Sequence, residues 1–255
     1  MILVPRIPQA ECASHSCGSD VLTGMLPDVR LIDFLARPDV REAPVRLLTR
    51  RVAVALADRF APGLLRRDAT FQLSNGLRMT ASLSDTVGRD LFVHGTFEWA
   101  TVRNWEDMLQ AGDTAVDVGA HVGTFTLSAA RRVGPTGRVV AFEPNAKTRE
   151  LLERNVRQNG FDDRVTVMPY ALLDRDDRLP LGTPTESNSG MSRLGHGDTF
   201  VTCRRLDDVL AELDVARVRA IKMDVEGFEA QVIAGGTRTF AERPSVSGPS
   251  AVERL

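Results

Sequence analysis

The first hundred residues change their hydrophobic pattern twice. Residues 1–28 scatter Pro, Ser and Gly without any period, which predicts an irregular leader. Over residues 29–60 the apolar positions recur at helical spacing, and Pro38 and Pro44 interrupt them. This pattern predicts two helices that precede the main domain.

A hairpin should follow these helices. Asn75-Gly76 separates two segments in which apolar and polar residues alternate, and this pair is a strong signal for a two-residue turn. We therefore predict strands around 70–74 and 77–83. Together with the helices they make a region, 29–105, that we expect on the substrate side of the main domain.

Residues 106–255 have the pattern of an α/β domain. Short apolar runs alternate with helical patterns, which is typical of a mainly parallel sheet covered by helices on both faces. Asn145 is placed to cap one helix, and the polar stretch 174–198 predicts a long loop. The expected strands are 114–119, 138–143, 164–173, 201–204 and 218–225, and the expected helices are 123–134, 145–160, 206–213 and 226–240.

Composition narrows the class of protein. With 43% hydrophobic and 26% charged residues, we expect a soluble globular protein rather than a disordered chain. A net charge of -2 argues against a nucleic-acid partner that needs a strongly basic face. No apolar run is long enough to span a bilayer, and three cysteines fit a reducing compartment, so we expect a cytoplasmic protein without stable membrane insertion. Cys12, His15 and Cys17 lack a second ligand group downstream, so we predict no metal site there.

The run from Asp117 to Thr124 joins a strand to a helix, where open parallel sheets bind their ligands. Gly119 permits a tight turn, Gly123 permits close approach of backbone or ligand, and the helix offers free N–H groups. A dinucleotide fold would place its middle glycine where this chain has His121. The turn therefore favours a nucleoside ligand without a pyrophosphate, and it argues against a nicotinamide-dependent dehydrogenase.

Charged residues follow two further strands. Glu143 ends the next strand, where a carboxylate can accept hydrogen bonds from both hydroxyls of a ribose. Lys222, Asp224 and Glu226 lie at the mouth of another strand, and Lys222 is one of only two lysines in the chain. Charges beside a buried strand must pair with one another or face a ligand.

S-adenosylmethionine has a ribose and no phosphate, so it is the obvious candidate ligand. Its adenine is expected near Tyr170 and Ala171, at the end of the third strand. Asp224 and Glu226 offer oxygen ligands, so a divalent cation stays open, but two carboxylates at one strand end do not define a cation site and we assign no metal ligands.

Four runs resemble the FkbM family of S-adenosylmethionine-dependent methyltransferases. They are 112–130 with GDTAVDVGAHVGTFTLSAA, 134–145 with GPTGRVVAFEPN, 151–160 with LLERNVRQNG, and 221–236 with IKMDVEGFEAQVIAGG. The resemblance covers residues 90–240 and implies a Rossmann-like class I methyltransferase fold. It also implies O-methylation of a hydroxyl on a small molecule such as a secondary metabolite, a sugar or a glycolipid precursor.

The resemblance and the strand ends together yield a set of expected site residues. Asp224 would lie close to the transferred methyl group, and Asp224 or His121 would accept the hydroxyl proton. Glu98, within the family-like segment 95–98, and Glu226 would shape the acceptor pocket. The expected cofactor contacts are Asp117, Gly119, Ala120, His121, Gly123, Thr124, Glu143, Tyr170, Ala171 and Asp224.

Two departures from the family pattern stand out. The family commonly has Asn where this chain has His121, which would place an imidazole beside the reaction centre. Only 15 residues follow Phe240, with at most one short strand, whereas a class I sheet continues further. We therefore expect an incomplete C-terminal half-sheet, or an exposed edge covered by the hairpin or by a second copy in a homo-oligomer.

Two other functions were weighed against a methyltransferase that acts on small molecules. A catalytically silent cofactor-binding or interaction protein stays open, because the C-terminal part is short. The run MPY at 168–170 only faintly resembles the motif of amino-methylating nucleic-acid enzymes and lies on a different strand. No nucleic-acid substrate is therefore expected.

Overall fold

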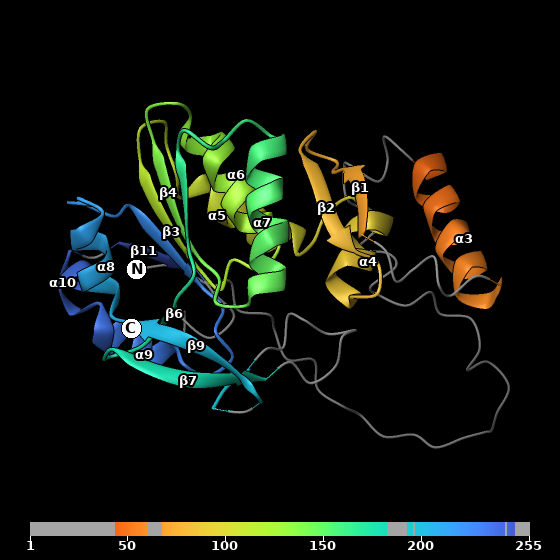
Figure 1. Ribbon diagram of the computed structural model, residues 1–255. Coiled ribbons are helices and arrows are strands. Elements are labelled where there is room, and N and C mark those ends of the chain that lie inside the picture. The colour runs from red at the N-terminus through yellow and green to blue at the C-terminus, as the bar shows by residue number, and fades with distance from the viewer. Residues whose placement is uncertain (1–43, 61–67, 183–192, 196, 243, 248–255) are drawn as a thin grey trace, which may run out of the picture. The chain divides into compact units, whose positions relative to one another are not determined.

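The computed structural model describes residues 44–60, 68–182, 193–195, 197–242 and 244–247, which belong to one compact unit of the chain (Figure 1). The predicted leader, the first predicted helix and the Cys12 cluster lie outside the described residues. The second predicted helix is α3, Pro44–Phe60. It begins at Pro44 because the first turn of a helix does not need the N–H that proline lacks. None of the described helices is long and apolar enough to cross a membrane.

Five parallel strands form the central sheet, in the order β11-β10-β3-β4-β5 (Figure 1). The crossovers that parallel strands require run through two helices between β3 and β5. The predicted α/β fold with a parallel sheet is therefore confirmed. The elements are β3 Thr114–Val118, α6 Thr124–Val133, β4 Arg138–Phe142, α7 Ala146–Gln158, β5 Val165–Met168, β10 Ala220–Met223 and β11 Ser245–Ser247.

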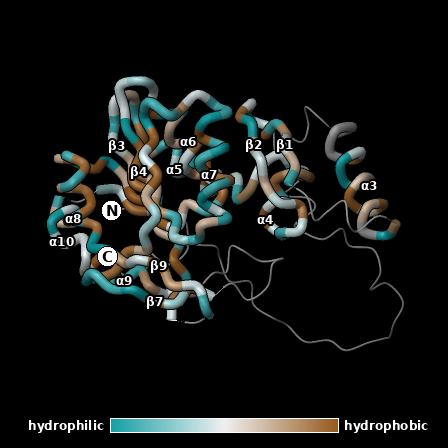
Figure 2. The backbone as a smooth tube through the Cα atoms, in the orientation of Figure 1, coloured by the Kyte–Doolittle hydropathy of each residue, from teal (hydrophilic) through white to brown (hydrophobic). Residues whose placement is uncertain are grey.

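Apolar side chains cover both faces of this sheet, which is why its strands are continuous hydrophobic runs. Ala115, Ala141 and Ala220 belong to the layer that contains Leu127 of α6 and Leu152 of α7. The opposite layer has the larger side chains, and Figure 2 shows these strands as predominantly hydrophobic. It consists of Val116, Val118, Val140, Phe142, Ile221 and Met223, packed against α8 Leu206–Glu212 and α9 Glu229–Gly235.

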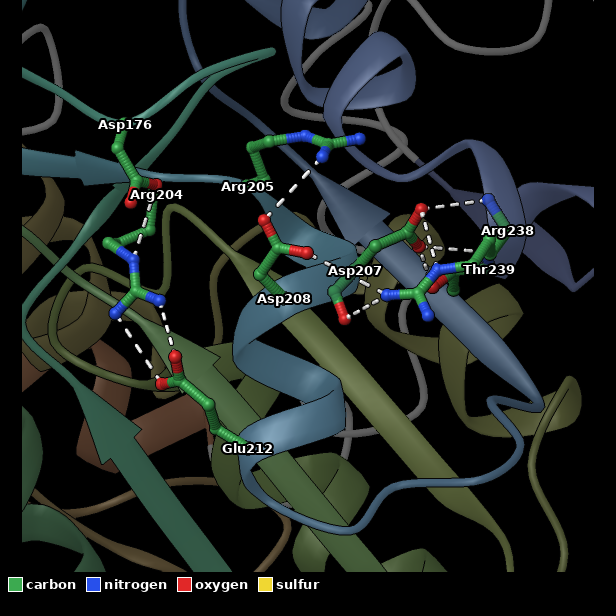
Figure 3. Close-up of polar contacts among 8 residues, drawn as sticks. All are labelled: Asp176, Arg204, Arg205, Asp207, Asp208, Glu212, Arg238 and Thr239. Atoms are coloured by element: carbon green, nitrogen blue, oxygen red, sulfur yellow. Dashed lines mark hydrogen bonds and ion pairs between the residues drawn. The ribbon is translucent and has the colours of Figure 1, made fainter.

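A polar network holds α8 against α10, Thr237–Ala241 (Figure 3). The buried Asp207 carboxylate accepts hydrogen bonds from the N–H groups of Arg238 and Thr239, at 2.8 and 3.0 Å. The Thr239 hydroxyl donates a third bond at 2.7 Å. Because the carboxylate occupies the first turn of α10, it caps that helix from a neighbouring element.

The predicted hairpin is present as β1, Asp68–Gln72, and β2, Arg78–Ser82, paired antiparallel. Leu73 donates to Leu77 at 2.8 Å, so by alternation the N–H and C=O groups of Arg78 and Thr80 point away from β1. Asn155, inside α7, forms hydrogen bonds with both backbone groups of Thr80. Asn159, the C-cap residue of α7, does the same with Arg78. Asn155 and Asn159 are four residues apart, which is a rise of about 6 Å along a helix and is close to the distance between alternate residues of a strand. The two amides can therefore each bond to one of the two alternate residues Thr80 and Arg78.

The hairpin therefore lies against α7 and not along the outer strand β11. This corrects the expectation that it covers the edge of the central sheet. The single short strand expected after Phe240 is β11, which pairs parallel to β10. The idea that a second copy covers the edge stays a prediction.

The predicted loop 174–198 is wrong at β7 and β8, which belong to a second sheet of four strands, and residues 183–192 and 196 lie outside the described residues. The order is β6-β9-β7-β8, with β7 antiparallel to both neighbours. The single strand expected over 164–173 is also wrong, because it divides at Pro169 into β5 and β6, which belong to different sheets. The strands are β6 Ala171–Leu172, β7 Asp177–Gly182, β8 Arg193–Leu194 and β9 Thr199–Arg204.

Three helical assignments also need correction. Helices α4, Thr86–His94, and α5, Trp99–Asp107, were not predicted. The helix expected over 226–240 begins only at Glu229 and is broken at Gly236. Its start is delayed because Glu226 and Gly227 have positive φ angles of 50° and 96°.

Candidate active site

A cavity of about 350 Å³ opens at the carboxyl ends of β3, β4 and β10. This is the edge where parallel sheets bind ligands, and the volume falls in the range of small-molecule sites. Ten of the predicted residues line it. They are Glu98, Gly119, Ala120, His121, Thr124, Glu143, Tyr170, Ala171, Asp224 and Glu226.

Asp117 and Gly123 were predicted as cofactor contacts, but the structure places them outside the cavity lining. Asp117 is fully buried and accepts a hydrogen bond from the Thr126 hydroxyl at 2.6 Å. Gly123 has a φ of 100°, and a Cβ there would lie 2.6 Å from Leu152 Cδ1. In this structure Gly123 therefore serves the packing of α7 against the turn.

Gly119 is the glycine that shapes the cavity floor. Its φ is 77°, and a Cβ at this position would overlap the backbone carbonyl of Asp224. The N–H groups of Gly119 and Ala120 both donate to the Phe142 carbonyl oxygen at 3.0 Å. Only glycine permits this close approach of the strand ends of β3, β4 and β10.

Glu143 connects this turn to α7. Its Oε2 accepts the His121 N–H at 2.8 Å, and its Oε1 accepts the Asn145 N–H at 2.9 Å. Asn145 caps α7 as predicted, because its side chain accepts from the Lys147 and Thr148 N–H groups. Burial raises the pKa of Glu143 to about 7, although both hydrogen bonds oppose the shift. Each carboxylate oxygen keeps a lone pair for a further donor.

Lys222 is a cavity residue that the set of expected contacts omitted. Its Nζ donates to the Gly119 carbonyl at 3.1 Å and lies 3.6 Å from Asp117 Oδ1 and 3.9 Å from Asp224 Oδ2. It also lies 4.8 Å from the centroid of the Phe125 ring. The available signal was its rarity, since a lysine at a strand end stands out in an arginine-rich chain.

Asp85 is a second residue that sequence reasoning missed. It precedes α4, is 4% exposed, and its Oδ2 lies 3.8 Å from His121 Nε2. Burial lowers the pKa of His121, while the charge of Asp85 opposes this shift. No pattern could identify Asp85, because the helix that follows it was itself not predicted.

Backbone strain is concentrated at the cavity. Four described residues other than glycine have positive φ, and three of them line the cavity. They are Glu98 at 44°, His121 at 51° and Glu226 at 50°. Such conformations persist only where the surrounding structure enforces them, and they are typical of functional sites.

The remaining wall is apolar and comes largely from elements that were not predicted. Val87 and Phe97 belong to the α4–α5 region, and Leu181 and Leu194 belong to the second sheet. Beside them, burial and the charge of Asp224 raise the pKa of Glu98. An acid that is neutral more often than usual therefore borders an apolar surface.

The family described as "Methyltransferase FkbM domain" matches residues 117–253 of this chain. The match begins at Asp117, near the end of β3, and includes β4 and β10, so it contains the strand ends that form the cavity. The chain belongs to the FkbM methyltransferase domain family. The predicted resemblance is thereby confirmed, and the class I, Rossmann-like assignment agrees with the parallel strand order.

Two curated family relatives align over parts of their length. Methyltransferase sdnD of Sordaria araneosa is 28% identical, covering 47% of this chain and 59% of the relative. The 2-O-methyltransferase NoeI of Sinorhizobium fredii is 27% identical, covering 53% and 62%. The chain thus spans about 60% of the length of these relatives.

Among solved structures, a methyltransferase from Geobacter sulfurreducens matches 62% of this chain and 64% of its own. The identity is 19% and the TM-score is 0.39. The fold assignment rests on the strand order and the family match.

Proposed function

We propose that the protein is an S-adenosylmethionine-dependent O-methyltransferase. Its acceptor would be a hydroxyl on a small molecule, such as a secondary metabolite, a sugar or a glycolipid precursor. The supporting observation is that Glu143, the Gly119 turn and Asp224 meet at one cavity in an FkbM domain. The name of the relative NoeI, a 2-O-methyltransferase, supports a hydroxyl acceptor.

The cavity residues fit this cofactor. The free lone pairs of Glu143 suit two ribose hydroxyls, and the turn at Gly119 and Ala120 leaves room for the amino-acid end. Phe142 and Tyr170 provide apolar surface for adenine. When bound, the cofactor supplies a methyl group as an electrophile on sulfur.

The chain itself then has to orient the acceptor and remove one proton. Asp224 and His121 border the cavity and are the candidate proton acceptors. Glu98 and Glu226 lie at the same cavity and would bind the polar parts of the acceptor. The apolar wall would exclude water from the reaction.

Calorimetry with S-adenosylmethionine and S-adenosylhomocysteine tests cofactor binding. Glu143→Gln should weaken binding about tenfold or more, because the amide keeps one acceptor oxygen but places an NH₂ donor where the second hydroxyl needs an acceptor. Glu153→Gln is the matched control, because Glu153 lies on α7 and does not line the cavity. Absence of binding by the wild type would overturn the proposal.

Methyl transfer to a panel of hydroxylated and amino acceptors tests the reaction. Transfer to hydroxyl compounds supports the proposal, and transfer only to amines contradicts the O-specific part. Cofactor binding without transfer to any acceptor would favour a silent cofactor-binding protein.

A further inference from the structure

Asp85 and His121 form an acid–imidazole pair at the edge of the cavity. Asp85 Oδ2 lies 3.8 Å from His121 Nε2, and the Asp85 side chain is 6% exposed. The imidazole is 20% exposed and lines the cavity. The buried Asp85 carboxylate therefore lies beside the His121 imidazole, which borders the cavity where an acceptor would bind.

The backbone fixes the imidazole from the other side. The His121 N–H donates to Glu143 Oε2 at 2.8 Å, and the residue has a φ of 51°. Such a conformation is strained for a residue with a Cβ, and this hydrogen bond helps to hold it. Asp85 is likewise held, because its carbonyl accepts the Arg89 N–H at 2.9 Å in the first turn of α4.

The other candidate base, Asp224, is in a different position. Its Oδ2 lies 3.9 Å from Lys222 Nζ, and its side chain is 41% exposed. Taking up a proton would cost Asp224 this ion pair. His121 instead gains an ion pair with Asp85 when it becomes protonated, and this attraction opposes the lowering of its pKa by burial and by Lys222.

We propose that His121 accepts the hydroxyl proton of the acceptor and that Asp85 is a positioning residue for this imidazole. This inference rests on the proposed function. The acceptor oxygen donates a lone pair to the methyl carbon, the carbon–sulfur bonding pair returns to sulfur, and the proton passes to His121. The Asp85 carboxylate lies 3.8 Å from Nε2 and attracts the positive charge that the ring gains when it accepts this proton.

The first test measures the imidazole in the protein without cofactor. Among the described residues, the charged groups that act on the His121 imidazole are Asp85, Lys222 and Asp224, and Glu143 accepts its backbone N–H; burial lowers the pKa of His121 from its ordinary value. Histidine NMR titration should show this pKa falling by about 1 unit or more in Asp85→Asn, since a nearby negative charge is lost. The His121 resonance is assigned by its loss in His121→Asn.

The matched control is the other described acid–imidazole pair, Asp90 and His94 on α4. Their side chains lie 4.0 Å apart, and neither residue lines the cavity. Asp90→Asn should leave the His121 titration and methyl transfer unchanged. An equal shift of His121 in both variants would contradict a specific role of Asp85.

The second test is the pH dependence of kcat/KM for any acceptor that is methylated. The acidic limb in the wild type should coincide with the His121 titration, because only the neutral ring accepts a proton. In Asp85→Asn the limb should move to lower pH, and kcat should fall by less than the roughly 10²–10⁴-fold expected for His121→Asn. A merely structural role would lower kcat without moving the limb.

Several outcomes overturn the inference without touching the proposed function. In the first, the acidic limb of the wild-type kcat/KM profile does not match the His121 titration. In the second, this limb moves in Asp224→Asn but not in Asp85→Asn. If Asp85→Asn does not fold, Asp85→Glu decides, because it keeps the charge and should keep the His121 titration near the wild type. Failure of the proposed function would instead appear as absent cofactor binding in calorimetry.

Discussion

Asn155→Leu should destabilise the protein far more than Asn159→Leu, although both amides bond to strand β2. Asn155 accepts the Thr80 N–H at 2.6 Å and donates to the carbonyls of Thr80 and Val122 at 2.9 and 2.8 Å. Asn159 makes the same pair of bonds with Arg78, at 2.9 and 2.7 Å. The two sites differ in burial, since Asn155 is 0% exposed and the Asn159 bonds to Arg78 are exposed.

Leucine has a similar volume but no hydrogen-bonding group, so both variants lose the same kind of bond. At Asn155, three backbone groups lose a buried partner at about 1–3 kcal/mol each, so the loss should reach about 3 kcal/mol or more. At Asn159, water replaces the amide and the loss should be about 1 kcal/mol. Helix propensity favours leucine by a small amount at Asn155, inside α7, which slightly reduces the loss expected there, whereas Asn159 is the C-cap residue of the helix.

Urea unfolding monitored by tryptophan fluorescence and circular dichroism measures both free energies of unfolding, with the slope checked for constancy. Asn155→Leu should also weaken cofactor binding, because Val122 belongs to the turn between β3 and α6. Equal losses of stability in the two variants would refute the argument that buried amides hold the hairpin edge.

Three further predictions concern the cavity floor. Because the pKa of Glu143 is raised to about 7, the native state binds more protons than the unfolded state between pH 4.5 and 7. Stability should therefore fall by about 3 kcal/mol as pH rises through this window, and urea unfolding of Glu143→Gln should show a flatter profile. Lys222→Met leaves the buried Asp117 carboxylate without its ion pair and should lower the free energy of unfolding by about 3–5 kcal/mol. Adding Asp117→Asn should recover part of this loss, whereas Lys147→Met, at an exposed position, should change stability little. Gly119→Ala should abolish cofactor binding in calorimetry because its Cβ overlaps backbone, whereas Gly76→Ala, with φ 87° and open space, should bind normally.

Much of the fold could be predicted because its signals are local. Buried strands such as 114–118 are continuous apolar runs, and the Asn75-Gly76 turn lies between alternating segments. Asn145 identified the start of α7 by its chemistry alone, since an amide there can accept from free N–H groups. Position after a strand likewise identified Glu143 and Asp224 as cavity residues.

The predicted strand 201–204 is present in β9, but the second sheet to which it belongs could not be predicted, because the pairing of β9 with β7 is not local. Leu179 and Leu181 lie on either side of Pro180, and a proline at this place argues against a strand. The strand forms because β9, some twenty residues later, provides partners and a shared apolar cluster with Val201 and Cys203. That sheet supplies Leu181 and Leu194 to the cavity, so this part of the cavity wall could not be predicted either.

Sequence alone determined that acids and a lysine gather at the strand ends, because the carboxyl ends of parallel strands share one edge. Only the tertiary structure decided which of them face the cavity. Asp117 lies outside the cavity lining, 3.6 Å from Lys222 Nζ, whereas Lys222 and Asp224 line the cavity, and Asp85 reaches His121 from a helix start 36 residues away. Burial and partner distance set the charge and proton affinity of each group, and these depend on residues that are remote in the chain.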